Sequence, residues 1–185
     1  MIADVRNREF VGKLKSALWP QDAIRPVNMW AVLDGAKDER IYNLVSRCYL
    51  DKCCLFAGEL SSELERAAPH LVQISPRDSV SDSLLTLGWG RAWGIFIQSD
   101  DSIRRLRRHL RTLLRVKDEV GRYLLFRYYD PRVLRVYLPT CLDQEVTSMF
   151  GLSITRFCME SEDADSIISF ELDWNDRLKH TVVKT

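Results

Sequence analysis

Short apolar runs alternate with amphipathic stretches along the first 140 residues of the chain. Such runs, with little polar interruption, are typical of buried strands, and we expect strands at 29–33, 53–57, 71–74 and 93–98. Between them, apolar residues recur at spacings of three and four, which predicts helices. This alternation predicts an α/β fold with a mixed, largely parallel central sheet flanked by helices.

The stretch YLLFRYYDPRVLRVYLPTC, residues 123–141, is predicted to form the middle of the fold. Its first seven residues are rich in aromatics and contain neither Gly nor Pro, so we expect a strand buried on both faces. Asp130 is a good helix N-cap, and Pro131 suits the first helical position, where a missing N–H costs nothing. A short helix that ends before Pro139 should follow.

The C-terminal part of the chain has a different pattern. Apolar and polar residues alternate at 154–160 and 167–173, which predicts a half-exposed antiparallel strand pair joined by an acidic loop at 160–165. The edge of the strand at 166–173 is a candidate docking site for a partner through strand addition. The last residues, KHTVVKT, are expected to form a frayed tail.

Composition narrows the functional classes. The net charge is +1, so no global field favours nucleic acid or a membrane surface. The N-terminal residues carry charges where a signal peptide needs an apolar core, and no run approaches the roughly 18 apolar residues of a membrane span. Five cysteines, two of them adjacent, do not suit a disulfide framework, so we expect a protein of the reducing cytoplasm.

Four sequence blocks together resemble the effector chaperones, or adaptors, of bacterial type VI secretion. The blocks are WAVLDGAKDERIYNL at 30–44, CLFAGEL at 54–60, GWGRAWGIFIQS at 88–99, which an arginine-rich helix follows, and FRYYDPRVLRVYLPTC at 126–141. The length predicts one domain, 1–185, or one domain with a small appendage. We divide it into an N-terminal helix and linker at 1–27, the family signature region that the resemblance covers at 28–160, and a terminal strand and tail at 161–185.

The resemblance also implies a function. The protein would be a non-enzymatic adaptor that binds a secreted toxin effector in the cytoplasm and loads it onto the VgrG-type spike protein, without a cofactor and without insertion into a membrane. In the family pattern, the recurring residues carry no enzymatic role. Those present here are Asp34, Gly35, Arg127, Asp130, Pro131 and Arg132.

The arginine-rich helix is the first candidate for a partner-binding surface. Four arginines fall within about 60° of one another on a helical wheel and two more flank them; the four are Arg104, Arg108, Arg111 and Arg115, and the two are Arg105 and Arg107. An acidic patch on a partner would suit this stripe. The alternatives are a solvated face, a face ion-paired by Glu171, Asp173 or the loop at 160–165, and a nucleic-acid site, which the lack of interleaved aromatics disfavours.

The loop GWGRAWG supplies the second candidate, because Trp is enriched in protein interfaces. Trp89 and Trp93 would contact the partner there, or they would simply cover the core. The glycine spacing matches neither phosphate-binding fingerprint.

Asp34 and Asp130 support the rival hypothesis, an α/β enzyme or nucleotide-binding domain, because each follows a predicted strand. Each also has a structural role, Asp34 in a turn with Gly35 and Asp130 as a cap. An unpaired buried arginine would be very costly, so we expect a buried pairing between these acids and Arg127, Arg132 or Arg135. We predict no metal site, because the cysteines and histidines lack the spacing of metal ligands. The residues considered are Cys48, Cys53, Cys54, His70, His109 and His180.

Overall fold

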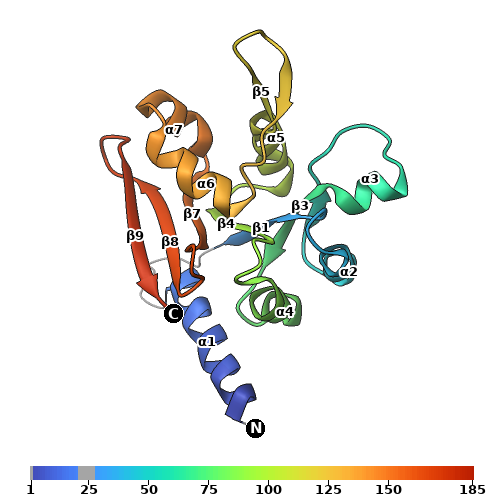
Figure 1. Cartoon of the computed structure of the whole chain (residues 1–185), viewed down its shortest axis with the longest axis vertical. Coiled ribbons are helices and arrows are strands. Elements are labelled where there is room, and N and C mark those ends of the chain that lie inside the picture. The colour runs from blue at the N-terminus through green and yellow to red at the C-terminus, as the bar shows by residue number, and fades with distance from the viewer. Residues whose placement is uncertain (1, 21–27) are drawn as a thin grey trace.

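The computed structural model describes residues 2–20 and 28–185, with side chains from residue 8 onward; the predicted linker at 21–27 lies outside the described residues. A single seven-stranded sheet forms the centre, in the order β2-β3-β1-β4-β7-β8-β9 (Figure 1). Its strands are β1 (Met29–Asp34), β2 (Lys52–Cys54), β3 (Pro69–Ile74), β4 (Gly94–Ser99), β7 (Ile154–Glu160), β8 (Ser166–Leu172) and β9 (Leu178–Lys184).

Every neighbouring pair in this sheet is antiparallel, so the prediction of a largely parallel sheet is wrong. The strand–helix alternation is present, but each crossover skips one place. β1 and β2 run in the same direction with β3 inserted between them, and β3 and β4 run in the same direction with β1 between them. The sequence pattern predicts the helices that connect these strands, but it does not predict that another strand lies between them. Because each inserted strand runs in the opposite direction, all neighbouring strands become antiparallel.

Helices cover both faces of the sheet (Figure 1). On one face lie α5 (Ile103–Leu113), α6 (Pro131–Tyr137), which continues into a short 3₁₀ turn (Leu138–Thr140), and α7 (Asp143–Phe150). On the other lie α1 (Ile2–Leu18), α2 (Glu39–Arg47) and α4 (Ser79–Gly88), while α3 (Ser62–Ala67) connects β2 to β3 and contributes no buried residue. The result is a three-layer domain with one apolar core on each side of the sheet.

The segment predicted as the buried central strand is divided between two environments. Tyr123–Leu125 is β6, which pairs with β5 (Arg115–Lys117) in an exposed two-stranded hairpin outside the main sheet. The chain enters the core only afterwards, where Tyr128 and Tyr129 are buried. The prediction of one strand buried on both faces is therefore wrong, because a continuous apolar run does not reveal where burial begins.

The C-terminal strands are confirmed as an antiparallel pair, β7 with β8. The predicted tail is instead β9, which pairs with β8 along its whole length, from Leu172↔Leu178 to Ser166↔Lys184. The edge of β8 is consequently occupied, and the edge strand on this side is β9. This strand was not predicted because its Lys, Thr and Val residues alternate only weakly between polar and apolar. Main-chain hydrogen bonds to β8 hold it in place.

The N-terminal helix is tied to the sheet by Arg156 on β7. This buried guanidinium donates to the carbonyl oxygens of Ala17 at 3.3 Å and Leu18 at 2.7 Å, the last residues of α1, where partial negative charge accumulates. Within the described chain, no helix combines the length and the apolar character that a membrane crossing requires.

Candidate functional site: an arginine-lined groove

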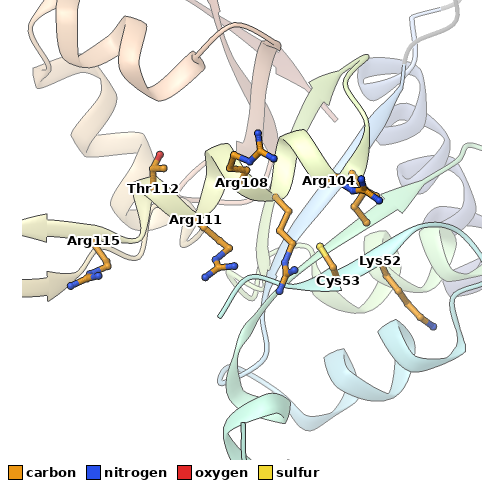
Figure 2. Close-up of a pocket in the computed structure, with 9 residues that line it drawn as sticks. Lys52, Cys53, Arg104, Arg108, Arg111, Thr112 and Arg115 are labelled. Atoms are coloured by element: carbon orange, nitrogen blue, oxygen red, sulfur yellow. The ribbon is translucent and has the colours of Figure 1, made fainter. Parts of the chain in front are cut away.

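Helix α5 is amphipathic for a simple reason. Leu106 and Leu110 are fully buried against the sheet, as the spacing predicts, and the opposite side carries the arginines. Between α5 and the edge strand β2 lies a groove of about 650 Å³, which we call the basic groove (Figure 2). It is lined by Lys52, Cys53, Ile103, Arg104, Arg107, Arg108, Arg111, Thr112 and Arg115.

Two of the basic side chains in this region have structural roles, and a third lies outside the groove. Arg107 donates to the carbonyl oxygen of Cys54 at 2.9 Å and so holds α5 against the segment after β2. Lys52 turns away from the groove, as Figure 2 shows, and donates to the carbonyl oxygens of Ser46 and Cys48. Arg105 lies 3.8 Å from the Asp101 carboxylate and does not line the basic groove.

The remaining four, Arg104, Arg108, Arg111 and Arg115, form what we call the arginine face. Among the described residues, no carboxylate lies within 4.0 Å of any of their guanidinium groups. The guanidinium of Arg115 stacks 4.1 Å from the centre of the Tyr123 ring. These are the four that the helical wheel groups together, although Arg115 belongs to β5 rather than to the helix.

The acids proposed as internal partners of this face are engaged elsewhere. Glu171 lies 3.9 Å from Arg156, and Asp165 pairs with Lys184. The Asp173 carboxylate accepts from the backbone N–H groups of Asn175 and Arg177 in the turn before β9. The alternative of an ion-paired face is therefore wrong, which leaves a solvated face or a binding face.

The tryptophan loop between α4 and β4 packs inward. Trp93 is only 3% exposed, and the Arg40 guanidinium lies 5.3 Å from its ring centre. Trp89 is half-buried, stacks on Phe96 and donates its indole N–H to the carbonyl oxygen of Ala164 at 2.8 Å. Both indoles cover the core that α1, α2 and α4 share, and neither lines the basic groove.

The same loop holds a buried carboxylate. The N–H of Gly90 donates to Glu160 at 2.6 Å and that of Ala92 donates at 2.9 Å. Gly90 has a φ of 78°, a left-handed conformation that glycine adopts without steric cost, and this conformation helps aim both amides at one side chain. Burial raises the pKa of Glu160, against the lowering effect of these two hydrogen bonds. No local sequence pattern indicates this long-range contact.

Asp34 and Asp130 form, with three cations, a group that we call the buried charge cluster. Both carboxylates are almost fully buried; Asp34 pairs with Arg127, and Asp130 pairs with Arg132 at 2.7 Å and Lys37 at 3.1 Å. Asp130 also caps α6 by accepting from the N–H of Arg132 at 3.0 Å. The predicted cap is confirmed. The predicted acid–arginine pairing is also present, but only its acids are buried, since the Arg127 and Arg132 side chains are 43% and 61% exposed.

Charge pairing dominates the ionisation of this cluster. Burial by itself raises the pKa of Asp130, but the hydrogen bonds from Arg132 and Lys37 outweigh that effect and lower the pKa to about 2. The Asp34 carboxylate in turn raises the pKa of Arg127. Asp130 is thus ionised at neutral pH, and cations contact both carboxylates.

Cys53, His70 and His109 pack or hydrogen-bond within the fold. Cys53 points from β2 toward α5 at the floor of the basic groove (Figure 2), and burial raises the pKa of its thiol to about 11. His70 and His109 each contact a backbone carbonyl, of Glu65 and Met149 respectively. Across the described ranges, 2–20 and 28–185, no three His, Cys, Asp or Glu residues are grouped so that they could hold a metal ion.

These features define the molecule as a three-layer α/β domain with a buried charge cluster and an exposed arginine face. The chain belongs to the family described as "Domain of unknown function (DUF4123)", whose model matches residues 29–148. All four sequence blocks, the buried charge cluster and the arginine face lie within this match. Neither the comparison with curated proteins nor that with solved structures finds a match.

Proposed function

We propose that this protein is a non-enzymatic adaptor that binds a type VI secretion effector in the cytoplasm and loads it onto the VgrG-type spike protein. The proposal starts from the resemblance of the four sequence blocks to such adaptors, and all four blocks lie inside the matched family region, residues 29–148. The mechanism is simultaneous binding: an adaptor that holds effector and spike together raises their effective concentration and makes or breaks no bond.

The arginine face is the observation that carries this proposal. Four guanidinium groups lie beside one groove without a carboxylate partner in the described chain, and the like charges of the three on α5 lower helix stability. An acidic surface on a partner removes that repulsion, and Arg is among the residue types that most often anchor protein interfaces. We therefore assign the face to effector or spike binding.

The rival hypothesis of an α/β enzyme or nucleotide-binding domain rested on Asp34 and Asp130. Both carboxylates are buried and bound to cations, and Asp130 also caps a helix. Neither lines the basic groove. This arrangement supports the structural role of these acids over a catalytic one.

Co-purification tests the proposal. The whole chain is expressed with the spike protein and the effector encoded beside it, as wild type and with Arg104, Arg108 and Arg111 changed to Glu. We expect a stable wild-type complex and about a tenfold or greater loss of affinity on charge reversal, because unlike charges become like. Circular dichroism checks that the fold is intact.

A matched control changes the same amount of charge elsewhere. Arg47, Arg77 and Arg177 are exposed and line neither this groove nor the surface beside it, so their triple change to Glu should leave the complex intact. A complex that survives reversal of the arginine face would move the interface to another surface. The absence of any complex with either partner would overturn the adaptor proposal.

A further inference from the structure

A second groove lies on the other side of the arginine face. It has a volume of about 370 Å³ and runs between α7 and the base of the β5–β6 hairpin. We call it the apolar groove, because its walls include Leu113, Val116, Phe126, Tyr137 and Met149, together with the polar rim of Thr112, Arg115, Gln144, Glu145 and Ser148.

The hairpin itself is unusually apolar for an exposed element. Val116 pairs directly with Leu124, which places both side chains on one face, and these side chains are 37% and 50% exposed. Leu125 and Tyr123, on the opposite face, are also more than half exposed. A two-stranded hairpin is only marginally stable by itself. The exposed edge strands of native proteins normally carry charged residues, which prevent pairing with other chains, rather than Val and Leu.

The two grooves adjoin each other. Thr112 and Arg115, at the C-terminal end of α5, line both of them. A ligand that crosses this shared wall can therefore contact Arg108 and Arg111 in the basic groove and Val116 in the apolar groove, with Leu124 paired beside Val116 on the hairpin. The basic and apolar parts form one composite surface.

We propose that this composite surface binds a peptide segment of a partner protein that carries acidic and apolar side chains together. Carboxylates of the segment occupy the basic groove, and its apolar side chains pack on the hairpin and into the apolar groove. The inference rests on the proposed adaptor function and specifies the chemistry of the segment that the adaptor recognises.

Charge complementarity and apolar exposure together select this occupant. A nucleic acid would match the arginines but not Val116 and Leu124. The Tyr123 ring already stacks with Arg115 and lies 5.2 Å from the Lys117 ammonium, and the Phe126 and Tyr137 rings of the apolar groove pack edge-on against each other, so none of these three rings is a free base-stacking platform. A purely apolar segment would leave four arginines unpaired. Only a segment with both kinds of side chain satisfies both halves of the surface.

Peptide display on the whole chain tests the inference, and it does not require the partner to be identified. Random peptides are selected against the wild-type protein, and the affinity of the best binder is measured by fluorescence anisotropy. We expect selected peptides to be rich in Asp or Glu beside Leu, Ile or Phe. Changing their acids to amides, or their apolar residues to Ser, should each weaken binding about tenfold.

Paired variants of the protein locate the binding. Arg108→Glu with Arg111→Glu should abolish the acid dependence, and Val116→Ser with Leu124→Ser should abolish the apolar dependence, each with about a tenfold loss of affinity. Two controls keep affinity: Arg105→Glu, on the same helix but outside the basic groove, and Val182→Ser with Val183→Ser, exposed on β9. Circular dichroism confirms folding of every variant.

The outcomes separate this inference from the proposed function. It is overturned if selection yields no peptide, if the peptides lack acids, or if the hairpin variants bind as tightly as wild type. An effector complex that forms but ignores the hairpin substitutions overturns the inference and leaves the adaptor function standing. Peptides that follow the pattern but fail to displace the effector support the composite surface and remove the arginine face from the proposed effector interface.

Discussion

The buried charge cluster and the arginine face lie in the same matched family region, yet the protein treats their charges in opposite ways. In the cluster, two carboxylates and three cations satisfy one another, and the carboxylates are almost fully buried. On the arginine face, four cations gather without a carboxylate and remain beside a groove. The first arrangement stabilises the fold internally, whereas the second leaves like charges facing one another without compensation.

The difference provides a physical criterion for function. Burying an ion costs several kcal/mol, so the ions of a cluster persist only when their partners are present inside the protein. Exposed cations carry no such cost and can persist without an internal partner, but packing like charges on one helix face does lower stability. Where a fold tolerates that penalty, a partner outside the chain is the simplest explanation.

The largest expected effect comes from breaking the buried charge cluster. Asp130→Ala removes the cap of α6 and leaves Lys37 and Arg132 without their carboxylate, so we expect a loss of about 3 kcal/mol in the free energy of unfolding. This estimate lies at the low end of such losses because the Arg132 side chain is 61% exposed and can regain water. Urea denaturation followed by circular dichroism measures the change.

Asp51→Ala is the matched control, because Asp51 is exposed and its carboxylate has no hydrogen-bond or ion-pair partner among the described residues. It should shift the free energy of unfolding by less than about 0.5 kcal/mol. Equal effects of the two substitutions would mean that the cluster does not stabilise the fold, and the contrast with the arginine face would fail.

For the buried charge cluster, the sequence predicted the helix cap at Asp130 but not which strands lie beside the two acids. The Asp130 cap depends on residues two positions apart, so the Asp-Pro dipeptide indicates it. The pairing of Asp34 with Arg127 could be expected only as a type, since a buried acid needs some cation. The strands that neighbour β1 could not be predicted, because no feature of the β1 sequence indicates that β3 and β4 lie on either side of it.

The arginine face likewise has a part that the sequence predicted, the arginines of α5, and a part that it missed, the neighbouring hairpin. Helical periodicity correctly placed Arg104, Arg108 and Arg111 on one side of α5, since helix spacing is a local feature, whereas Arg115 lines the same groove from β5, beyond the helix. The hairpin beside it was missed because Tyr123, Leu124 and Leu125 form an apolar run that is equally compatible with the core. Their exposure follows from pairing with Arg115–Lys117, whose polar character offered no strand signal.

The pH dependence of stability should separate two buried carboxylates. The native pKa of Asp130 is lowered to about 2 from 3.8, so the native state binds fewer protons than the unfolded state in that window. Its contribution of about 2 kcal/mol is present above pH 4 and is lost as the pH falls toward 2. Glu160 has a raised native pKa, so its contribution instead declines as the pH rises above 4.5.

Urea denaturation across a pH series tests these opposite signs as differences from wild type. Differences are required because Asp38 and Asp165, whose pKa values are also about 2, titrate in the same window. Asp130→Asn should lose part of the stability gain between pH 2 and 4, and Glu160→Gln should lose the decline above pH 4.5. The same sign for both variants would contradict the ionisation described here.

The smallest effect tests the arginine face itself. Arg108→Gln removes a charge that neighbours Arg104 and Arg111 at helical spacing, so it should raise the free energy of unfolding by about 0.5 kcal/mol. Arg105→Gln, three residues earlier on the same helix, removes the 3.8 Å contact with Asp101 and should leave stability unchanged or slightly lower. Both are measured by urea denaturation at low salt, and the difference between them should shrink at high salt because salt screens exposed charges. A gain in stability at Arg108, coupled to weaker partner binding, would show that this helix keeps a destabilising charge for recognition; a loss at Arg108 would mean that an internal interaction already satisfies it.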